Sequence, residues 1–188
     1  MANKNTKGFG LIPGDRLGNT PAISGQSKYF IDAGYGTAIY NGGAVKSASG
    51  YIVEGQGSAA PVIGVLNGVF YNAATTLKPT WSNYYAGSIT PANSEDITAF
   101  VNDDPFQNYI VATDDAAAQA LFLETFDMNA SAGDTNTGKS TATLDIGTTG
   151  ADNKQYRLLR SAEDPENDDA TAAYRSVIVV ANLLELQS

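Results

Sequence analysis

Cysteine and histidine are both absent from the 188 residues of this sequence. Without cysteine there are no disulfides, no thiol nucleophiles and no thiolate ligands for zinc. Without histidine there is no Ser-His-Asp triad and no side chain whose ordinary pKa lies near neutrality. The two absences exclude many enzyme mechanisms. They leave carboxylate chemistry, lysine chemistry, metals bound by oxygen ligands, or no chemistry at all.

Charge is scarce and unevenly distributed. Asp, Glu, Lys and Arg make up 16% of the chain, against roughly 25% in an average soluble domain. Residues 1–94 carry 6 basic and 3 acidic side chains and residues 95–188 carry 5 and 17, so the formal charge of −9 divides into +3 and −12. This acidic balance argues against a nucleic-acid partner, because that binding draws its affinity from the neutralisation of phosphates.

Long apolar runs are lacking too. No stretch reaches the ~18 apolar residues of a membrane span, and residues 1–7 lack the apolar core of a signal peptide. We therefore expect synthesis in the cytoplasm and no membrane partner.

Glycine is abundant, with 19 residues, and it separates short apolar runs. Runs at residues 29–31, 37–40 and 61–66 are typical of an antiparallel β-sandwich or β-barrel. Residues 47–50, Ser-Ala-Ser-Gly, predict a hairpin turn because Gly50 accepts a positive φ. The sequence thus predicts a compact, mainly antiparallel all-β fold, with barrel and sandwich both open.

Three further elements are predicted from propensity. Residues 97–101 and 109–112 flank Asp-Asp-Pro and predict a strand pair. Residues 176–186 predict a strand, because the run from Val177 to Val180 is β-branched throughout. Residues 113–128 predict one short helix, since an acidic start precedes an alanine-rich run.

Residues 1–27 predict an extended N-terminal arm, and residues 28–188 the β-rich domain. Five glycines and two prolines interrupt any helix or long strand in the arm. Its apolar cluster is Phe9, Leu11 and Ile12, with the basic Arg16 nearby. A solvated tail is one interpretation. The other is that the cluster docks on a neighbouring chain, because it needs a place to be buried.

Residues 133–140 match the spacing of a phosphate-binding P-loop, Gly-x4-Gly-Lys-Ser. That loop needs a buried strand before it and a helix after it. The residues before it form no apolar run, and the threonines after it favour a strand. We interpret the match as a loop between strands, and we predict no cofactor.

Acidic residues form three further candidate sites. Within the acidic stretch 163–169, residues 164–169 resemble the start of a calcium loop, but the sixth and twelfth positions hold Asp169 and Arg175 instead of glycine and glutamate. A solvated loop is the favoured interpretation, and a weak irregular metal site stays open. The pairs at residues 103–104 and 114–115 could suit a glycosidase, but adjacency on one strand does not aim both carboxylates at one substrate. We predict no metal site, no catalytic residues and no enzyme.

Aromatic residues concentrate around Trp81, Tyr84 and Tyr85, preceded by Phe70 and Tyr71. Such a group serves as buried core, as a protein interface or as a sugar-stacking platform. Interleaved Asn and Ser favour an interface over a sugar site.

The chain resembles small head proteins of tailed bacteriophages, especially phages of aquatic bacteria. The likeness runs in order along nearly the whole chain, and the segments that carry it are residues 1–13, 63–71, 78–85, 100–105 and 177–182. It rests on structural motifs, and no catalytic residue carries it.

The resemblance implies a capsid decoration, or cement, protein. Such a protein is made in the host cytoplasm and sits on the outer surface of the virion capsid. It binds the phage major capsid protein and stabilises contacts between its subunits, often as a homotrimer. We expect Phe9, Leu11, Ile12 and Arg16 to contact the capsid, and Trp81, Tyr84 and Tyr85 to be interface aromatics. A phage tail or fibre module and a glycan-binding β-domain remain as alternatives. An acidic-residue hydrolase is the least favoured alternative.

Overall fold

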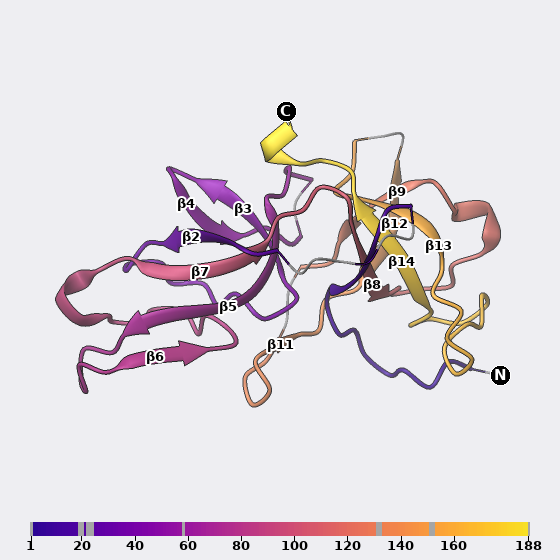
Figure 1. Ribbon diagram of the computed structural model, residues 1–188. Coiled ribbons are helices and arrows are strands. Elements are labelled where there is room, and N and C mark those ends of the chain that lie inside the picture. Colours follow the sequence, from indigo (N-terminus) through magenta and orange to yellow (C-terminus); the bar gives the residue numbers. More distant parts are fainter. Residues whose placement is uncertain are drawn as a thin grey trace.

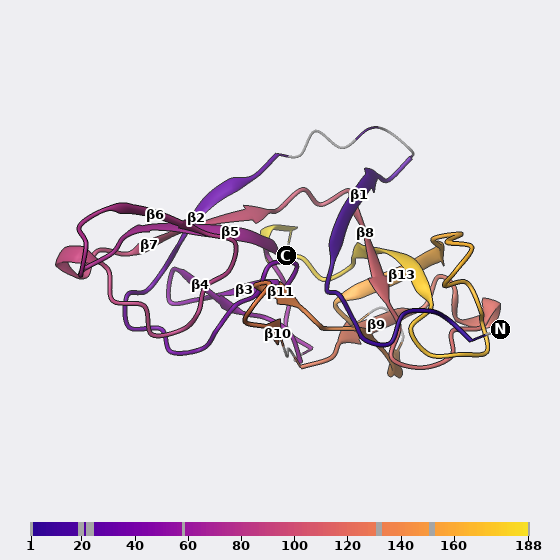
Figure 2. The same cartoon turned by 90° about the horizontal axis from the view of Figure 1, so that it is seen from below.

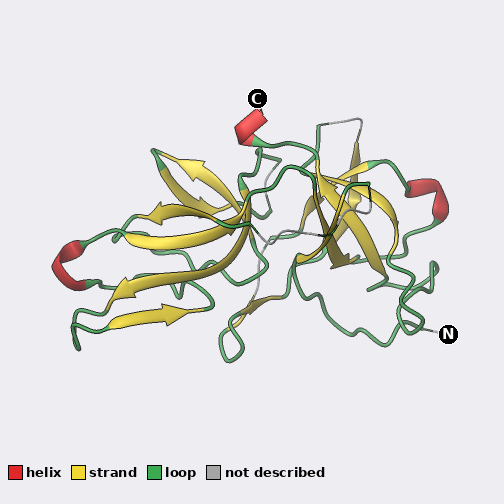
Figure 3. Cartoon of the chain, in the orientation of Figure 1, coloured by secondary structure: helices red, strands yellow, loops and turns green. Residues whose placement is uncertain are grey.

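Strands dominate this computed structural model, which describes residues 2–18, 21, 25–57, 59–130, 133–150 and 153–187 (Figure 3). They pair antiparallel, which confirms the predicted all-β fold. Two six-stranded sheets, named sheet A and sheet B here, lie side by side (Figure 1).

Sheet A joins the N-terminal strand to strands from the second half of the chain. Its order is β1-β8-β14-β13-β9-β12. Its strands are β1 (Ile12–Arg16), β8 (Gln107–Ala112), β9 (Thr125–Met128), β12 (Leu144–Gly150), β13 (Tyr156–Ser161) and β14 (Ser176–Ala181).

Sheet B is built from the residues between β1 and β8. Its order is β2-β7-β5-β3-β4, and β6 pairs with β5. Because β2 and β4 also contact each other, the sheet curls around its own core. Its strands are β2 (Ser27–Ile31), β3 (Ala44–Ala48), β4 (Tyr51–Glu54), β5 (Gly64–Asn72), β6 (Pro79–Ser82) and β7 (Ile97–Asn102).

The remaining elements are short. Strands β10 (Gly133–Asp134) and β11 (Lys139–Ser140) form a two-stranded ribbon. Single 3-10 turns occur at η1 (Ala92–Ser94), η2 (Gln119–Leu121) and η3 (Glu185–Gln187).

Each sheet buries apolar side chains on its inner side, and the two sheets pack together. Tyr109, Phe126 and Tyr156 fill the core of sheet A, and Ala44 and Val65 of sheet B belong to the same cluster. A second cluster of isoleucine, leucine, valine, alanine and tyrosine fills the curl of sheet B. The fold is therefore of the sandwich type, and neither sheet closes into a barrel within the described ranges.

Buried polar groups also join the sheets. The Gln155 side chain is fully buried and donates hydrogen bonds to the carbonyl oxygens of Gly55 (2.8 Å) and Ala60 (3.1 Å). Its own amide oxygen accepts from the Met128 N–H at 3.2 Å. Since an unpaired buried amide is costly, this network fixes how the sheets meet.

The hairpin prediction at residues 47–50 is confirmed. Ser49 (φ 52°) and Gly50 (φ 87°) both take left-handed conformations between β3 and β4. Two consecutive positive φ values match the twist of the flanking strands.

The predicted helix over residues 113–128 is wrong. That segment holds only the turn η2 and the strand β9. The Arg175 guanidinium donates to the Ala117 carbonyl at 2.5 Å and lies 5.4 Å from the Phe122 ring centroid. Phe126 faces the core of sheet A from a strand. Tertiary contacts thus override the helix propensity of the alanines.

The strand pair predicted at residues 97–101 and 109–112 is half right. Both strands exist, as β7 and β8, but they belong to different sheets. The residues between them carry the chain from sheet B to sheet A, and the Arg16–Asp104 ion pair (2.7 Å) ties this crossover to β1.

The described residues of the N-terminal segment are extended but do not project from the body. β1 pairs with β8 of sheet A, and the Asn5 N–H donates to the Asn167 side chain at 2.7 Å. Residues 19, 20 and 22–24 of the predicted arm lie outside the described residues.

Candidate functional site

The predicted capsid-contact residues divide between core and surface. Leu11 is only 1% exposed and packs in the core of sheet A, so the prediction that it contacts a partner is wrong. Ile12 is 46% exposed. Phe9 is half-buried, and Arg16 pairs with Asp104. The alternation of a strand explains the division, because successive side chains point to opposite sides.

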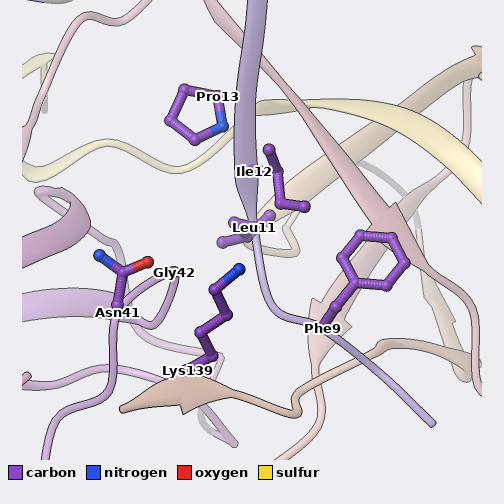
Figure 4. A pocket seen from close by; sticks show the side chains of 7 residues that line it. All are labelled: Phe9, Leu11, Ile12, Pro13, Asn41, Gly42 and Lys139. Atoms are coloured by element: carbon purple, nitrogen blue, oxygen red, sulfur yellow. The ribbon is translucent and has the colours of Figure 1, made fainter. Parts of the chain in front are cut away.

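A small hollow lies where this segment meets sheet B (Figure 4). It measures about 160 Å³ and is lined by Phe9, Ile12, Pro13, Asn41 and Lys139, among others. The Leu11 N–H donates to the Gly42 carbonyl at 2.8 Å and closes its floor. The hollow is thus built by the contact between the two sheets.

A second hollow lies on the outer side of sheet A. The register places Ile12, Ile110 and Ile178 side by side on three strands, with Arg160 opposite Ile178 on the next. A cavity of about 140 Å³ opens over this row. We call it the isoleucine hollow, and its lining is Gly14, Asp15, Asn108, Ile110, Arg160 and Ile178.

The isoleucine hollow contains polar groups without partners in the described chain. The Asn108 side chain is 7% exposed, and its buried Oδ1 accepts no hydrogen bond. No ion pair forms at Asp15 or Arg160 within the described ranges. A buried acceptor without a donor costs about 1–3 kcal/mol. The hollow therefore offers an apolar floor, an acceptor and both signs of charge to a bound group.

The outer side of sheet B carries a row across four adjacent strands, with aromatic side chains on three of them and Thr98 on the fourth. Phe30 lies opposite Thr98, Thr98 opposite Phe70, and Phe70 opposite Trp81. Phe30 is 51% exposed, Phe70 39% and Trp81 52%. In the neighbouring row Lys28 and Gly68 both lie opposite Phe100. We call this surface the aromatic face, made of Lys28, Phe30, Gly68, Phe70, Trp81, Thr98 and Phe100.

Gly68 determines how Trp81 lies. A Cβ on Gly68 would stand 2.5 Å from the Trp81 ring, so that ring crosses the β5 backbone in contact with it. The ring centroids of Trp81 and Phe100 are 5.3 Å apart at an interplanar angle of 53°. The Lys28 ammonium lies 5.9 Å from the Phe100 centroid. The indole is therefore held by contacts with Gly68 and with the Phe100 ring.

Of the three predicted interface aromatics, the structure places only Trp81 on this face. Tyr85 is fully buried in the core of sheet B, so its assignment to an interface is wrong. Tyr84 stacks on Tyr40 with centroids 5.5 Å apart. Sequence reasoning missed Lys28, Phe30 and Phe100. A run of consecutive apolar residues in one strand, such as Tyr29-Phe30-Ile31, could have indicated the two phenylalanines, because one side of such a strand then carries apolar side chains away from the core.

The P-loop match forms the β10–β11 ribbon, with a strand as the next regular element. Gly133 packs against the Tyr40 ring and Gly138 against Asn83 and Tyr84, with the nearest side-chain atoms 2.1 Å and 2.4 Å from an added Cβ. Lys139 points towards the β1 segment (Figure 4). These glycines serve close packing between sheets, as expected of a loop between strands.

The carboxylate pairs have structural partners. Burial and the hydrogen bond to Asp103 raise the pKa of Tyr29 to about 12, so its hydroxyl stays protonated and donates at 2.8 Å. Asp114 accepts hydrogen bonds from the Ile146 N–H and the Asn129 side chain. Asp115 accepts from the Ala116 N–H at 2.7 Å.

The acidic loop at residues 163–169 is held by local contacts. Asp168 accepts from the Ser161 hydroxyl and pairs with Arg175 at 2.7 Å, and these contacts lower the pKa of its carboxyl. Hydrogen bonds from Asn167 and from the Glu166 N–H lower the pKa of Asp164. Among the described residues no group of three acidic side chains is placed to hold a metal ion.

Comparison with known proteins gave no family assignment. No family model, curated protein or solved structure matches the chain. Within the described residues, no helix is both long and apolar enough to span a membrane.

Proposed function

We propose that this chain is a non-catalytic virion protein that decorates the outside of a phage head and docks on the major capsid protein through the isoleucine hollow. The observation that carries the proposal is the buried, unpaired Asn108 Oδ1 beside a partly exposed isoleucine row. We infer that docking turns the Asn108 amide outward, so that a backbone N–H of the docked segment satisfies this acceptor. The resemblance to phage head proteins, described above, supports the same partner.

The chemistry of the hollow suits a polypeptide. Ile110 and Ile178 offer an apolar floor, and Asp15 and Arg160 offer one charge of each sign. Such a mixture of apolar centre and polar rim is typical of protein interfaces. A protein that binds the assembled shell and not the free subunits stabilises the shell by mass action. Because the shell repeats the site many times, a modest affinity at each site can give strong overall binding through avidity.

The test adds purified protein to expanded phage heads that were assembled without it from the major capsid protein of the same phage. Gly14→Val fills the hollow, since a Cβ on Gly14 meets only ordinary contacts at 3.7 and 3.9 Å. We expect Gly14→Val to fold and to lose head binding. Gly25→Val is the matched control, because a Cβ on Gly25 meets nothing within 4 Å. Equal binding by both variants contradicts the docking site.

Electron microscopy of gold-labelled particles tests the assignment to the head. Label along the head surface is expected, whereas label on the tail or its fibres favours the alternative of a tail module. Mass measurement of the free and bound protein tests the homotrimer, which stays a prediction.

A further inference from the structure

We propose that the aromatic face of sheet B is a carbohydrate-binding platform for oligosaccharides of β-linked glucopyranose or N-acetylglucosamine units. This site lies on the other sheet from the isoleucine hollow and does not depend on the proposed capsid docking.

The first argument is the packing and exposure of the Trp81 side chain. The outer edge of its ring, Cζ2 and Cη2, packs at Gly68, and the residue is 52% exposed, so the ring is held in place while much of it stays accessible to solvent. The π face of an aromatic ring carries partial negative charge. Pyranose rings with equatorial substituents expose slightly positive axial C–H groups, which stack on such a face. An exposed ring that is already packed against the protein offers this contact with little reorganisation on binding.

The second argument is the row beside Trp81. Phe70 lies on the next strand, β5, and Phe30 lies on β2, beyond Thr98 of β7, with 39% and 51% of their surface exposed. Strands are spaced about 4.8 Å apart, so the row crosses roughly 15 Å. A row of exposed rings of this length offers successive stacking positions to a chain of sugars.

The third argument is the size of the face. A fully exposed aromatic side chain presents roughly 200 Å², so Phe30, Phe70 and Trp81 together expose on the order of 300 Å². A stable protein interface takes about 800 Å² from each partner. The face is therefore small for a protein partner and large enough for a few sugar rings.

Lys28 supplies the polar contact. It is exposed, it is the one charged residue of the aromatic face, and its ammonium lies 5.9 Å from the Phe100 centroid. Three N–H donors at this position can bond sugar hydroxyls. Thr98, between Phe30 and Phe70, adds a hydroxyl.

Trp81 is the only tryptophan of the chain, so its fluorescence reports on this site alone. We would titrate the full-length protein with cellohexaose and with chitohexaose, and measure the same binding by calorimetry. The expected result is a saturable change in Trp81 emission with at least one of the two. Phe70→Ser should weaken binding about tenfold or more, and calorimetry should detect no binding by Trp81→Ala.

Leu77→Ser is the matched control, because Leu77 is 73% exposed but lies in the turn before β6 and outside the aromatic face. It should bind as the unchanged protein does, and circular dichroism should show all variants folded. The absence of a saturable signal with either sugar overturns the proposal. So does self-association that Trp81→Ala abolishes, since the face would then be an interface between copies.

Discussion

The two sheets bury similar cores but present different outer sides. Sheet B presents three exposed aromatic side chains and one lysine to solvent, and the outer edge of the Trp81 ring packs against Gly68. Sheet A shows a row of isoleucines that ends at Arg160, with a hollow and a buried acceptor from Asn108. The aromatic side is a supported surface suited to stacking, and the isoleucine side is a recess suited to an inserted group.

The difference also follows the charge. The first half of the chain carries +3 and the second half −12, and most of sheet A comes from the second half. Carboxylates such as Asp168 and Asp104 are paired there with arginines. Carboxylates near sheet B accept hydrogen bonds from its tyrosines instead, Asp103 from Tyr29 and Asp96 from Tyr51, so the two sheets should respond differently to mutation and to acid.

The largest expected effect separates the two sides of β1. Leu11→Ala removes a side chain that is 1% exposed, and the cavity should lower the free energy of unfolding by about 2–5 kcal/mol. Ile12→Ala, at 46% exposure, should cost about 0.5 kcal/mol. Urea denaturation of both variants measures the contrast. Similar losses would mean that β1 does not sit in sheet A as described.

The next effect concerns the support of Trp81. Gly68→Ala places a Cβ 2.5 Å from the indole and 2.9 Å from the Ser82 carbonyl oxygen, and such overpacking costs about 1–3 kcal/mol. The displaced ring should also change its emission maximum. Gly25→Ala, in open space, should change neither quantity. An unchanged spectrum for Gly68→Ala would contradict the packing of the Trp81 ring against Gly68, on which the carbohydrate proposal depends.

A smaller effect of opposite sign is expected in the isoleucine hollow. Asn108→Leu removes the buried Oδ1 that lacks a donor. The free energy of unfolding should then rise by about 1 kcal/mol, because the desolvation cost disappears. Thermal denaturation checks the sign. A clear loss of stability would show that Asn108 is paired in solution and that the hollow has no unmet acceptor.

Local pattern was enough to predict most strands of this fold. The turn at Ser49 and Gly50 and the β-branched run of β14 are determined by residues close in sequence, so their prediction holds, although the strand predicted over residues 176–186 ends at Ala181. The helix over residues 113–128 failed because Arg175, far along the chain, holds the Ala117 carbonyl. The pairing of β7 with β8 failed for the same reason, since sheet membership depends on distant strands.

The candidate sites were predictable only in part. Ile12 and Trp81 were identified from composition, and both are exposed. Leu11 and Tyr85 were assigned with them but are buried. A shift of one residue along a strand moves a side chain from the buried face to the exposed face, and the sequence alone does not determine the strand register. Asn108 gave no sequence signal, because an unpaired acceptor exists only once its neighbours are placed.

The smallest effect should appear as a pH dependence at Ser161, at the end of β13 in sheet A. The Ser161 hydroxyl donates to Asp168, and this contact, helped by Arg175, lowers the pKa of the carboxyl. A pKa that is lower in the folded state than the ordinary value of about 3.9 stabilises the fold above that value. This stability is lost as the pH falls through the folded-state pKa.

Ser161→Ala should therefore cost up to about 1 kcal/mol at pH 7, the Asp168 carboxyl being 38% exposed and partly screened. It should cost less at a pH low enough to protonate the carboxyl in the folded state. Urea denaturation at the two pH values measures the difference. Thr98→Ala in sheet B is the control, and its effect should not depend on pH, because Thr98 lies between Phe30 and Phe70. An equal loss for Ser161→Ala at both pH values would show that the hydroxyl acts through packing and not through the charge of Asp168.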